Sequence, residues 1–191
     1  MSQHFPRLND PTLIELLMQS GVGVIPTDTV YGLVARASDE QAIRNLYAIK
    51  QREIQPGTIV ADSIADLEAL GFQLSDLSKV AHYWPASVSV VLPAIAVPAY
   101  LKHVRTDLPV RIPADKSLRK LLRVTGPLMT TSANAPKAPT STVIDEAVAY
   151  FGNDIDFYVD GGDMSDRPPS TIIGFDDAGE IIVHRQGAVT L

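Results

Sequence analysis

Residues 24–33 read Val24-Ile25-Pro26-Thr27-Asp28-Thr29-Val30-Tyr31-Gly32-Leu33. The apolar run 22–25 predicts a β-strand, which the proline and the hydroxyl-rich loop then end. Three hydroxyl side chains and one carboxylate crowd in front of Gly32, and this is too polar for a core strand. Such a loop is typical of the wall of a site that holds a small polar molecule. The ordinary alternative is a polar connection between a strand and a helix.

Helix and strand signals alternate along the rest of the chain. Capping residues and apolar periodicity predict helices that begin at Asp10, Ser38, Ser63, about Ser75, Asp115 and Ser141. Short apolar or β-branched runs predict strands at 22–25, 58–61, 88–92, 110–112, 128–131, 157–159, 171–175 and 181–184. The turn residues 176–179 predict a hairpin between the last two strands. We therefore expect one α/β domain over residues 1–191, with a twisted, mixed β-sheet flanked by helices.

Composition narrows the class of protein. The chain has 191 residues, of which 46% are hydrophobic and 20% charged, and this suits one globular domain with a substantial core. It has no cysteine, which excludes disulfides and thiolate metal sites. No apolar run approaches the ~20 residues that span a bilayer, and the N-terminus lacks a signal-peptide pattern. We predict a cytoplasmic protein that does not bind membranes.

The net charge of −6 disfavours binding of nucleic acid over the whole surface. A polyanion would need a local basic patch. Candidate residues lie in two groups, at Lys102, His103 and Arg105 and at Lys116, Arg119, Lys120 and Arg123. A solvated helix face is the ordinary interpretation of the second group.

Two basic segments could bind an anion. Lys50-Gln51-Arg52 ends a predicted helix, where cations complement the helix dipole, but Lys and Arg there could equally clamp phosphate. Arg111 lies between the apolar residues Val110 and Ile112 of a predicted strand. It either points to solvent or faces inward, and an inward arginine needs an anionic partner such as a carboxylate or phosphate ligand.

Three further segments are rich in hydroxyl and amide groups. Thr130-Thr131-Ser132-Ala133-Asn134 follows a strand and is either an ordinary turn or a phosphate cradle. Pro169-Ser170-Thr171 and His184-Arg185-Gln186-Gly187 lie near the C-terminus. The chain lacks a P-loop, a G-x-G-x-x-G and an H-E-x-x-H motif, and its four histidines are not spaced as a metal pair. These groups suit reactions run by positioning and charge stabilisation, such as nucleotidyl transfer.

Taken in order, these segments resemble the YrdC/TsaC family from about Gly21 to Gly187. The motifs are P-T-D-T-V-Y-G-L, K-Q-R, W-P (Trp84-Pro85), V-R-I-P, T-S-A-N, P-S-T and R-Q-G. The resemblance implies a YrdC-like fold with a concave substrate cleft, in the single-domain form. It also implies a threonylcarbamoyl-AMP synthase, which makes L-threonylcarbamoyladenylate and pyrophosphate from L-threonine, bicarbonate and ATP for tRNA modification.

The resemblance also assigns roles to residues. Thr27, Arg111 and Ser170 would bind threonine, with Arg111 on its carboxylate. Lys50 and Arg52 would act in catalysis and face the ATP phosphates. The remaining ATP contacts would come from Thr131, Ser132, Asn134, Ser141 and Arg185. Mg²⁺ would ride on the phosphates, without a protein carboxylate cage. tRNA or double-stranded RNA and tRNA-modification proteins are further candidate partners.

Several positions depart from the family pattern. Glu53 and Gln55 replace the proline after K-x-R and the lysine of K-P-L, and Pro136-Lys137 replaces S-G. The W-P-G-P-x-T signature reads Trp84-Pro85-Ala86-Ser87-Val88-Ser89. Two alternatives therefore stay open: a double-stranded RNA or tRNA-binding module with the YrdC fold, and a divergent carbamoyl-adenylate-forming paralogue.

Overall fold

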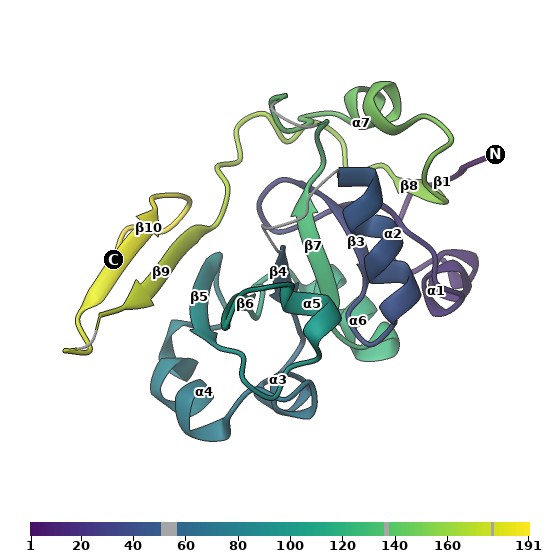
Figure 1. Ribbon diagram of the computed structural model, residues 1–191. Helices are drawn as coiled ribbons and strands as arrows, with labels where there is room; N and C mark the ends of the chain where they lie inside the picture. Colours follow the sequence, from purple (N-terminus) through teal and green to yellow (C-terminus); the bar gives the residue numbers. More distant parts are fainter. Residues whose placement is uncertain (51–56, 136–137, 177) are drawn as a thin grey trace.

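The computed structural model describes residues 1–50, 57–135, 138–176 and 178–191, and these form a ten-stranded mixed sheet with helices on both faces (Figure 1). The strand order is β1-β8-β2-β3-β7-β4-β6-β5-β9-β10. The strands are β1 (Gln3–Phe5), β2 (Gly23–Pro26), β3 (Tyr31–Arg36), β4 (Thr58–Val60), β5 (Val88–Pro93), β6 (Asp107–Arg111), β7 (Leu128–Ser132), β8 (Phe157–Val159), β9 (Thr171–Phe175) and β10 (Ile181–Arg185). Parallel and antiparallel pairs alternate irregularly, and β9 and β10 form an antiparallel hairpin that projects to one side (Figure 1).

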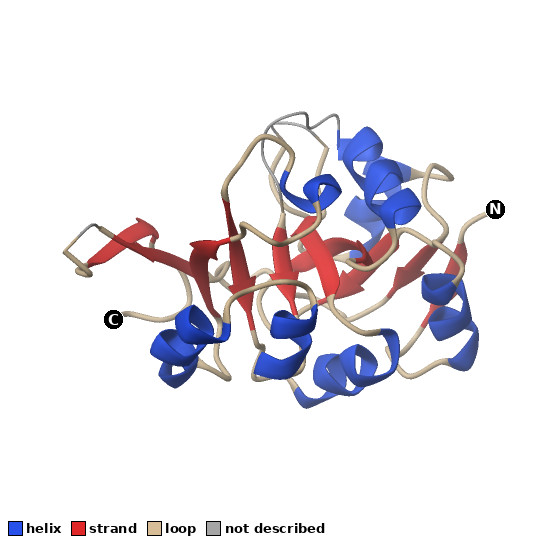
Figure 2. Ribbon diagram, turned by 60° about the horizontal axis from the view of Figure 1, so that its bottom comes forward, coloured by secondary structure: helices blue, strands red, loops and turns tan. Residues whose placement is uncertain are grey.

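The helices form two layers. They are α1 (Pro11–Met18), α2 (Glu40–Lys50), α3 (Ile64–Ala69), α4 (Leu74–Val80), α5 (Ala99–Lys102), α6 (Lys116–Thr125) and α7 (Ile144–Phe151), with one 3₁₀ turn at Ala81–Tyr83. Apolar residues of α1 and α6 pack in one cluster, whereas α2, α3, α4, α5 and α7 contribute to another. Figure 2 shows helices on opposite sides of the strands. The sheet is therefore covered on both faces.

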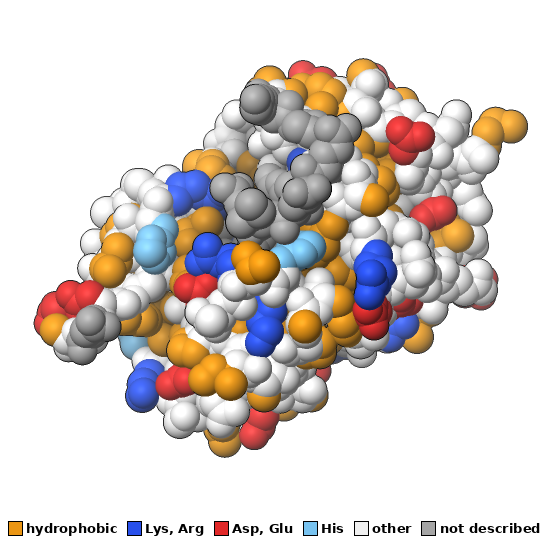
Figure 3. Space-filling model, in the orientation of Figure 1, with side chains coloured by type: hydrophobic (Ala, Val, Ile, Leu, Met, Phe, Trp, Pro, Cys, Tyr) orange, Lys and Arg blue, Asp and Glu red, His pale blue; other side chains and the backbone are white. Residues whose placement is uncertain are grey.

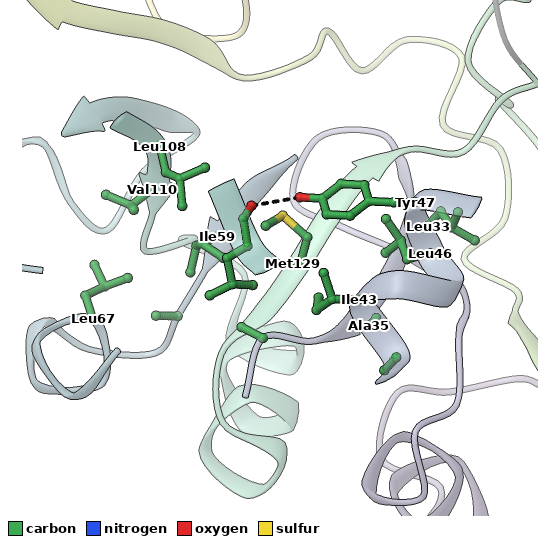
Figure 4. Packing of buried hydrophobic residues seen from close by; sticks show 14 of the residues in the cluster. Leu33, Ala35, Ile43, Leu46, Tyr47, Ile59, Leu67, Leu108, Val110 and Met129 are labelled. Carbon is green, nitrogen blue, oxygen red and sulfur yellow. Dashed lines mark hydrogen bonds between the residues drawn. The ribbon is translucent and has the colours of Figure 1, made fainter. Parts of the chain in front are cut away.

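Strand alternation explains how one sheet feeds two clusters. Val24 packs in the α2-side cluster and Ile25 in the α1/α6-side cluster, and Ile59 and Val60 divide in the same way. Successive side chains of a strand point to opposite faces, so a sheet that is buried on both faces needs apolar residues at successive positions. Figure 4 shows part of the larger cluster, where Ile59 and Met129 of the sheet lie near Ile43 of α2.

Local capping sets the start of several helices. Asp10 Oδ1 accepts from the Thr12 amide at 2.9 Å, and Asp115 Oδ1 accepts from the Leu118 amide at 2.7 Å. Both caps agree with the sequence. Asp39, rather than Ser38, accepts from the Ala42 amide at the start of α2. The helix expected from Ser141 begins at Ile144 because the Ser141 hydroxyl is committed to the Ala133 carbonyl.

Helices α1 and α6 cover only part of their face of the sheet. Strands β5, β6 and β9 contribute no residue to the cluster under α1 and α6. Val90, Val110 and Ile173 of these strands pack on the opposite face. Neighbouring residues on a strand point to opposite faces, so these strands turn a second set of side chains away from that core. These side chains belong to Ser89, Pro109, Arg111 and Ile172. This open area of the sheet is where the cavity lies.

The mixed α/β fold expected from the sequence is confirmed, but the hydroxyl-rich loop does not lead into a helix. Residues 27–30 join β2 to β3 in an antiparallel pair in which Pro26 lies opposite Tyr31. The alternative of a strand-to-helix connection is therefore wrong. Strands β1 and β3 and helix α5 were not expected, and β6 begins at Asp107 rather than at Val110. Within the described ranges, no helix is long and apolar enough to cross a membrane.

Candidate active site

A cavity of about 370 Å³ opens where β3, β7, β4 and β6 meet the ends of the 27–30 and 169–170 segments. Hydroxyl side chains dominate its lining, and they belong to Thr27, Thr29, Thr58, Thr130, Thr131, Ser132, Thr140 and Ser170. Arg111 and Arg185 add positive charge. The cavity is therefore suited to a polar, anionic ligand. Of the residues predicted to form the site, Thr27, Arg111, Thr131, Ser132, Ser170 and Arg185 lie in this lining.

A glycine lets the strands approach closely at the cavity. A Cβ at Gly32 would lie 2.4 Å from Thr130 Oγ1. A side chain there would displace the Thr130 hydroxyl, which lines the cavity. Gly32 is thus required by packing between these strands rather than by backbone conformation.

The 27–30 loop is held by its own hydroxyls. Thr27 Oγ1 donates to the Val30 carbonyl at 2.6 Å and accepts from the Thr29 amide at 3.2 Å. Thr27 and Thr29 are buried, at 7% and 3% exposure. The loop is rigid enough to present Asp28 to the far wall of the cavity.

Tyr31 anchors a second segment to this loop. Its hydroxyl donates to the Gly162 carbonyl at 2.9 Å and accepts from the Gly161 amide at 2.7 Å. Burial raises the pKa of Tyr31, so the phenol stays protonated and can donate. The hydroxyl therefore acts as a structural link to the segment after β8.

Arg111 faces inward, and its anionic partner is Asp28. The two atoms Arg111 Nη2 and Asp28 Oδ1 lie 3.0 Å apart, and the side chains are only 4% and 5% exposed. Ser87 Oγ donates to the other carboxylate oxygen, Oδ2, at 2.9 Å. Burial lowers the pKa of Arg111, and the charge of Asp28 opposes this. The sequence predicted an anionic partner for an inward arginine and suggested a ligand; the structure supplies a carboxylate of the chain itself.

This ion pair keeps unused bonding capacity. Arg111 Nε and Asp28 Oδ1 are buried, yet neither has a hydrogen bond among the described residues. The Thr131 hydroxyl, which also lines the cavity, is likewise without a hydrogen bond in this part of the chain. Buried polar groups are normally hydrogen-bonded. Arg111 and Thr131 belong to the cavity lining, so their unpaired groups are candidate ligand contacts, whereas His103 Nε2, also unpaired in the described chain, lies outside this lining.

Ser170 and Arg185 form a second cluster on the cavity wall. Arg185 Nη2 donates to Ser170 Oγ at 3.0 Å and to the Ser170 carbonyl at 2.9 Å. Ser89 Oγ lies 3.0 Å from Ser170 Oγ. Partial burial and the charge of Arg111 lower the pKa of Arg185. Although Arg185 and Ser170 were assigned to different substrates, the fold joins them directly.

Lys50 lies behind the lining, against the Ser132–Asn134 segment. Its Nζ donates to the Ser132 carbonyl at 2.9 Å, to Asn134 Oδ1 at 2.7 Å and to the Asn134 carbonyl. Ser132 Oγ also donates to Asn134 Oδ1, and Ser141 Oγ donates to the Ala133 carbonyl. Lys50, Asn134 and Ser141 therefore shape the segment that presents Thr131 and Ser132 to the cavity. Arg52, Glu53, Gln55 and Pro136-Lys137 lie outside the described residues.

Asp28, Ser87 and Ser89 were not singled out as site residues from the sequence. Asp28 had a signal, since it is the only acidic residue of the 24–33 stretch. The serines stood in the W-P-G-P-x-T signature, but their partners are distant along the chain: 59 residues separate Ser87 from Asp28 and 81 separate Ser89 from Ser170. Only the fold shows that they contact residues of the site.

Many of the candidate basic-patch residues are already paired. Arg119 and Arg123 each place Nε 2.7 Å from a carboxylate oxygen of Asp62. Arg105 pairs with Asp107, and Lys102 donates to the Ala94 and Ile95 carbonyls. Figure 3 shows basic side chains scattered over one face, with acidic ones beside several of them. The structure therefore gives little support to a continuous polyanion-binding surface on this face.

Acidic residues do not gather into a metal centre. The described residues contain no group of three His, Cys, Asp or Glu side chains placed to hold a metal ion. A divalent cation in this cavity would consequently meet hydroxyl and carbonyl oxygens, which Mg²⁺ accepts together with water and phosphate oxygens.

A family model described as "Telomere recombination", for Sua5, YciO and YrdC, matches residues 15–187. A threonylcarbamoyl-AMP synthase of Pseudoalteromonas atlantica is 30% identical over 171 residues, covering 86% of this chain and 90% of that protein. Its namesake in Pseudoalteromonas translucida is 32% identical, with 83% and 89% covered. A putative synthase of Methanocaldococcus jannaschii is 31% identical, with 92% and 84% covered.

Solved structures agree with the fold. P. abyssi Sua5 complexed with L-threonine superimposes with a TM-score of 0.84 at 26% identity, covering 98% of this chain and 57% of that one. This chain thus spans little more than half the length of that Sua5. E. coli YciO superimposes with a TM-score of 0.81 at 24% identity, covering 98% of this chain and 96% of YciO. At this level of identity, the match to YciO supports the fold alone.

Proposed function

This chain belongs to the Sua5/YciO/YrdC family, and from that membership and its cavity we propose that it is a threonylcarbamoyl-AMP synthase. The reaction forms L-threonylcarbamoyladenylate and pyrophosphate from L-threonine, bicarbonate and ATP. The relatives named for this activity are matched over most of their length. The enzyme is a nucleotidyltransferase, and its product would feed tRNA modification.

The buried Arg111 in a hydroxyl-lined cavity is the observation that carries this proposal. A carboxylate is the natural partner for the unused Nε–H, since a guanidinium can bind it with charge-assisted hydrogen bonds. Thr27 and Ser170 lie in the same lining and could accept or donate to the polar groups of threonine. An amino acid with a free carboxylate therefore fits this wall.

ATP would occupy the neighbouring wall. Thr131 and Ser132 are presented by the segment that Lys50, Asn134 and Ser141 brace. Arg185 also lines the cavity, where it contacts Ser170. Lys50 and Arg52 would add positive charge for the phosphates, although Lys50 acts in this arrangement through the loop that it holds. Mg²⁺ would enter on the phosphates rather than on a carboxylate cluster.

The residues would act by positioning and charge stabilisation. The threonine amine adds to bicarbonate-derived CO₂ to give a carbamate. A carbamate oxygen then attacks the α-phosphorus in line, and the bond to pyrophosphate breaks. Negative charge grows on the phosphate oxygens, so Arg52 and the hydroxyls of 131–132 would lower the barrier directly, and Lys50 through the segment that it braces. No covalent intermediate with the protein is needed.

Pyrophosphate release tests this proposal directly. The full chain is incubated with MgATP, L-threonine and bicarbonate, and each component is left out in turn. We expect release to require all three. Equal release without threonine, or none with every component present, would refute the synthase and favour the carbamoyl-adenylate paralogue or the RNA-binding module. Binding of tRNA or of partner proteins can be measured separately on the same material.

A further inference from the structure

We propose that Ser87 is a positioning residue, which orients the Arg111 guanidinium through Asp28. Ser87 Oγ donates to Asp28 Oδ2 at 2.9 Å, and Asp28 Oδ1 lies 3.0 Å from Arg111 Nη2. The three side chains thus form a line that ends at the cavity. The expected effect on threonine binding rests on the proposed function, whereas the orientation of the Arg111 guanidinium is independent of it.

The backbone of Ser87 is fixed on both sides of its turn. The Thr171 amide donates to the Ser87 carbonyl at 3.1 Å, which ties the turn to β9. The Ala86 amide donates to the Ile112 carbonyl at 3.1 Å, one residue beyond Arg111. Trp84 Nε1 donates to the Val88 carbonyl at 2.8 Å across the same turn. A hydroxyl held this firmly can hold a second side chain in place.

Asp28 needs such support because its contact with Arg111 is incomplete. The ion pair lacks hydrogen-bond geometry at Oδ1, and Arg111 Nε has no partner among the described residues. A carboxylate that makes only a point contact can swing about its Cβ–Cγ bond. The hydroxyl of Ser87 on the other oxygen opposes that rotation. It thereby keeps the Arg111 guanidinium in one orientation at the cavity wall.

Ser87 stands at a position where this chain departs from the W-P-G-P-x-T signature, which has proline there. Proline has no side-chain donor. The Ser87–Asp28 bond therefore depends on the serine that this chain has in place of the signature's proline.

Hydrogen exchange of the Arg111 Nε–H tests the geometry without any substrate. Its NMR resonance is assigned by its loss in Arg111→Lys. In Ser87→Ala the Asp28 carboxylate loses one of its two contacts, so the guanidinium should fluctuate more, and we expect this buried proton to exchange about tenfold faster. Ser87→Thr keeps the hydroxyl and should exchange like the wild type. Unchanged exchange in Ser87→Ala overturns the proposal.

Kinetics test the consequence for the reaction. Ser87→Ala should raise the threonine KM about three- to tenfold, while kcat and the ATP KM stay within about twofold. Ser87→Thr should restore the threonine KM. Ser20→Ala is a matched control, because Ser20 Oγ donates to Asp39 Oδ2 at 2.7 Å and is not a cavity-lining residue.

The outcomes separate the two claims. A raised threonine KM in Ser87→Ala, with Ser20→Ala unchanged, supports positioning by Ser87. An equal rise in both variants, or in the ATP KM alone, overturns it. If the wild-type chain releases no pyrophosphate, the proposed function fails while the exchange measurement still decides the role of Ser87.

Discussion

Asp28 and Asp62 both bind arginine, and they do so in opposite ways. Asp62 uses both carboxylate oxygens, each 2.7 Å from the Nε of Arg119 or Arg123 on α6. The Arg123 side chain is 57% exposed and that of Arg119 29%, whereas the Asp62 side chain is only 11% exposed, so this cluster is open to solvent on its arginine side. Asp28 holds one arginine, Arg111, and both side chains are almost completely buried.

The difference lies in what each cluster leaves unused. Both oxygens of Asp62 accept hydrogen bonds. The buried pair leaves Arg111 Nε and Asp28 Oδ1 without one in the described chain. A cluster that only ties elements together can use all its groups, whereas a binding site must keep some for its ligand. Unused bonding capacity, rather than charge, therefore distinguishes the Asp28–Arg111 pair from the Asp62 cluster.

Removing the buried guanidinium should have the largest effect. Arg111→Met leaves Asp28 as a buried carboxylate without its counter-charge, and we expect a loss of about 3–5 kcal/mol in the free energy of unfolding. Urea denaturation measures it. The double variant Asp28→Asn with Arg111→Met should regain most of the loss. Arg105→Met, which breaks the exposed pair with Asp107, should cost no more than about 1 kcal/mol.

Lys50 is a buried cation whose Nζ, unlike the arginines bound to Asp28 and Asp62, donates to backbone and amide oxygens of residues 132–134. In Lys50→Met these acceptors lose their donor, and we expect a loss of roughly 2–3 kcal/mol in the free energy of unfolding. The ATP KM should rise more than the threonine KM because the braced segment is on the nucleotide wall. Denaturation and initial-rate kinetics measure the two effects. A larger rise in the threonine KM would contradict the division of the cavity into two walls.

Arg111→Lys sharpens the comparison by keeping the charge and removing the planar fork. Asp28 retains a cation, so the fold should be nearly as stable as in the wild type. The threonine KM should rise about 10- to 100-fold, with the ATP KM changed much less. Initial rates at varied threonine and ATP decide this. If ATP affinity collapses while threonine binding is kept, Arg111 belongs to the phosphate wall.

The sequence predicts the fold class well because most of its signals are local. Asp10 and Asp115 cap helices as expected, and the apolar runs at 58–61 and 157–159 become strands. Strand β3 was missed because Gly32 and the polar loop before it mask the pattern of a strand. It is buried on both faces, so it has no alternation of apolar and polar residues.

The site was predictable only in part, for a physical reason. Motif order singled out Arg111 and Ser132, which line the cavity. The contacts behind the lining join distant parts of the chain: Asp28 pairs with Arg111, Ser87 donates to Asp28, and Ser89 lies beside Ser170. Burial of a charge required a partner for Arg111, but only three-dimensional placement could name Asp28 as that partner.

The smallest effect is expected at Asp62, the surface counterpart of Asp28. Burial alone would raise its pKa, but hydrogen bonds from Arg123 and Arg119 hold it below its ordinary value of 3.8. Its contribution to stability is therefore present above pH 3.8 and is lost as pH falls through the lower, folded value. Asp62→Asn should lower the free energy of unfolding by no more than about 1 kcal/mol at pH 7, since Arg123 is largely exposed. Urea denaturation from pH 7 down to about pH 3 should show the gap to the wild type closing as acid protonates Asp62. Threonine and ATP KM should stay unchanged, because Asp62 is not in the cavity lining. A gap that widens in acid, or a raised threonine KM, would show that the surface cluster also serves the site and would remove the distinction between the two aspartates.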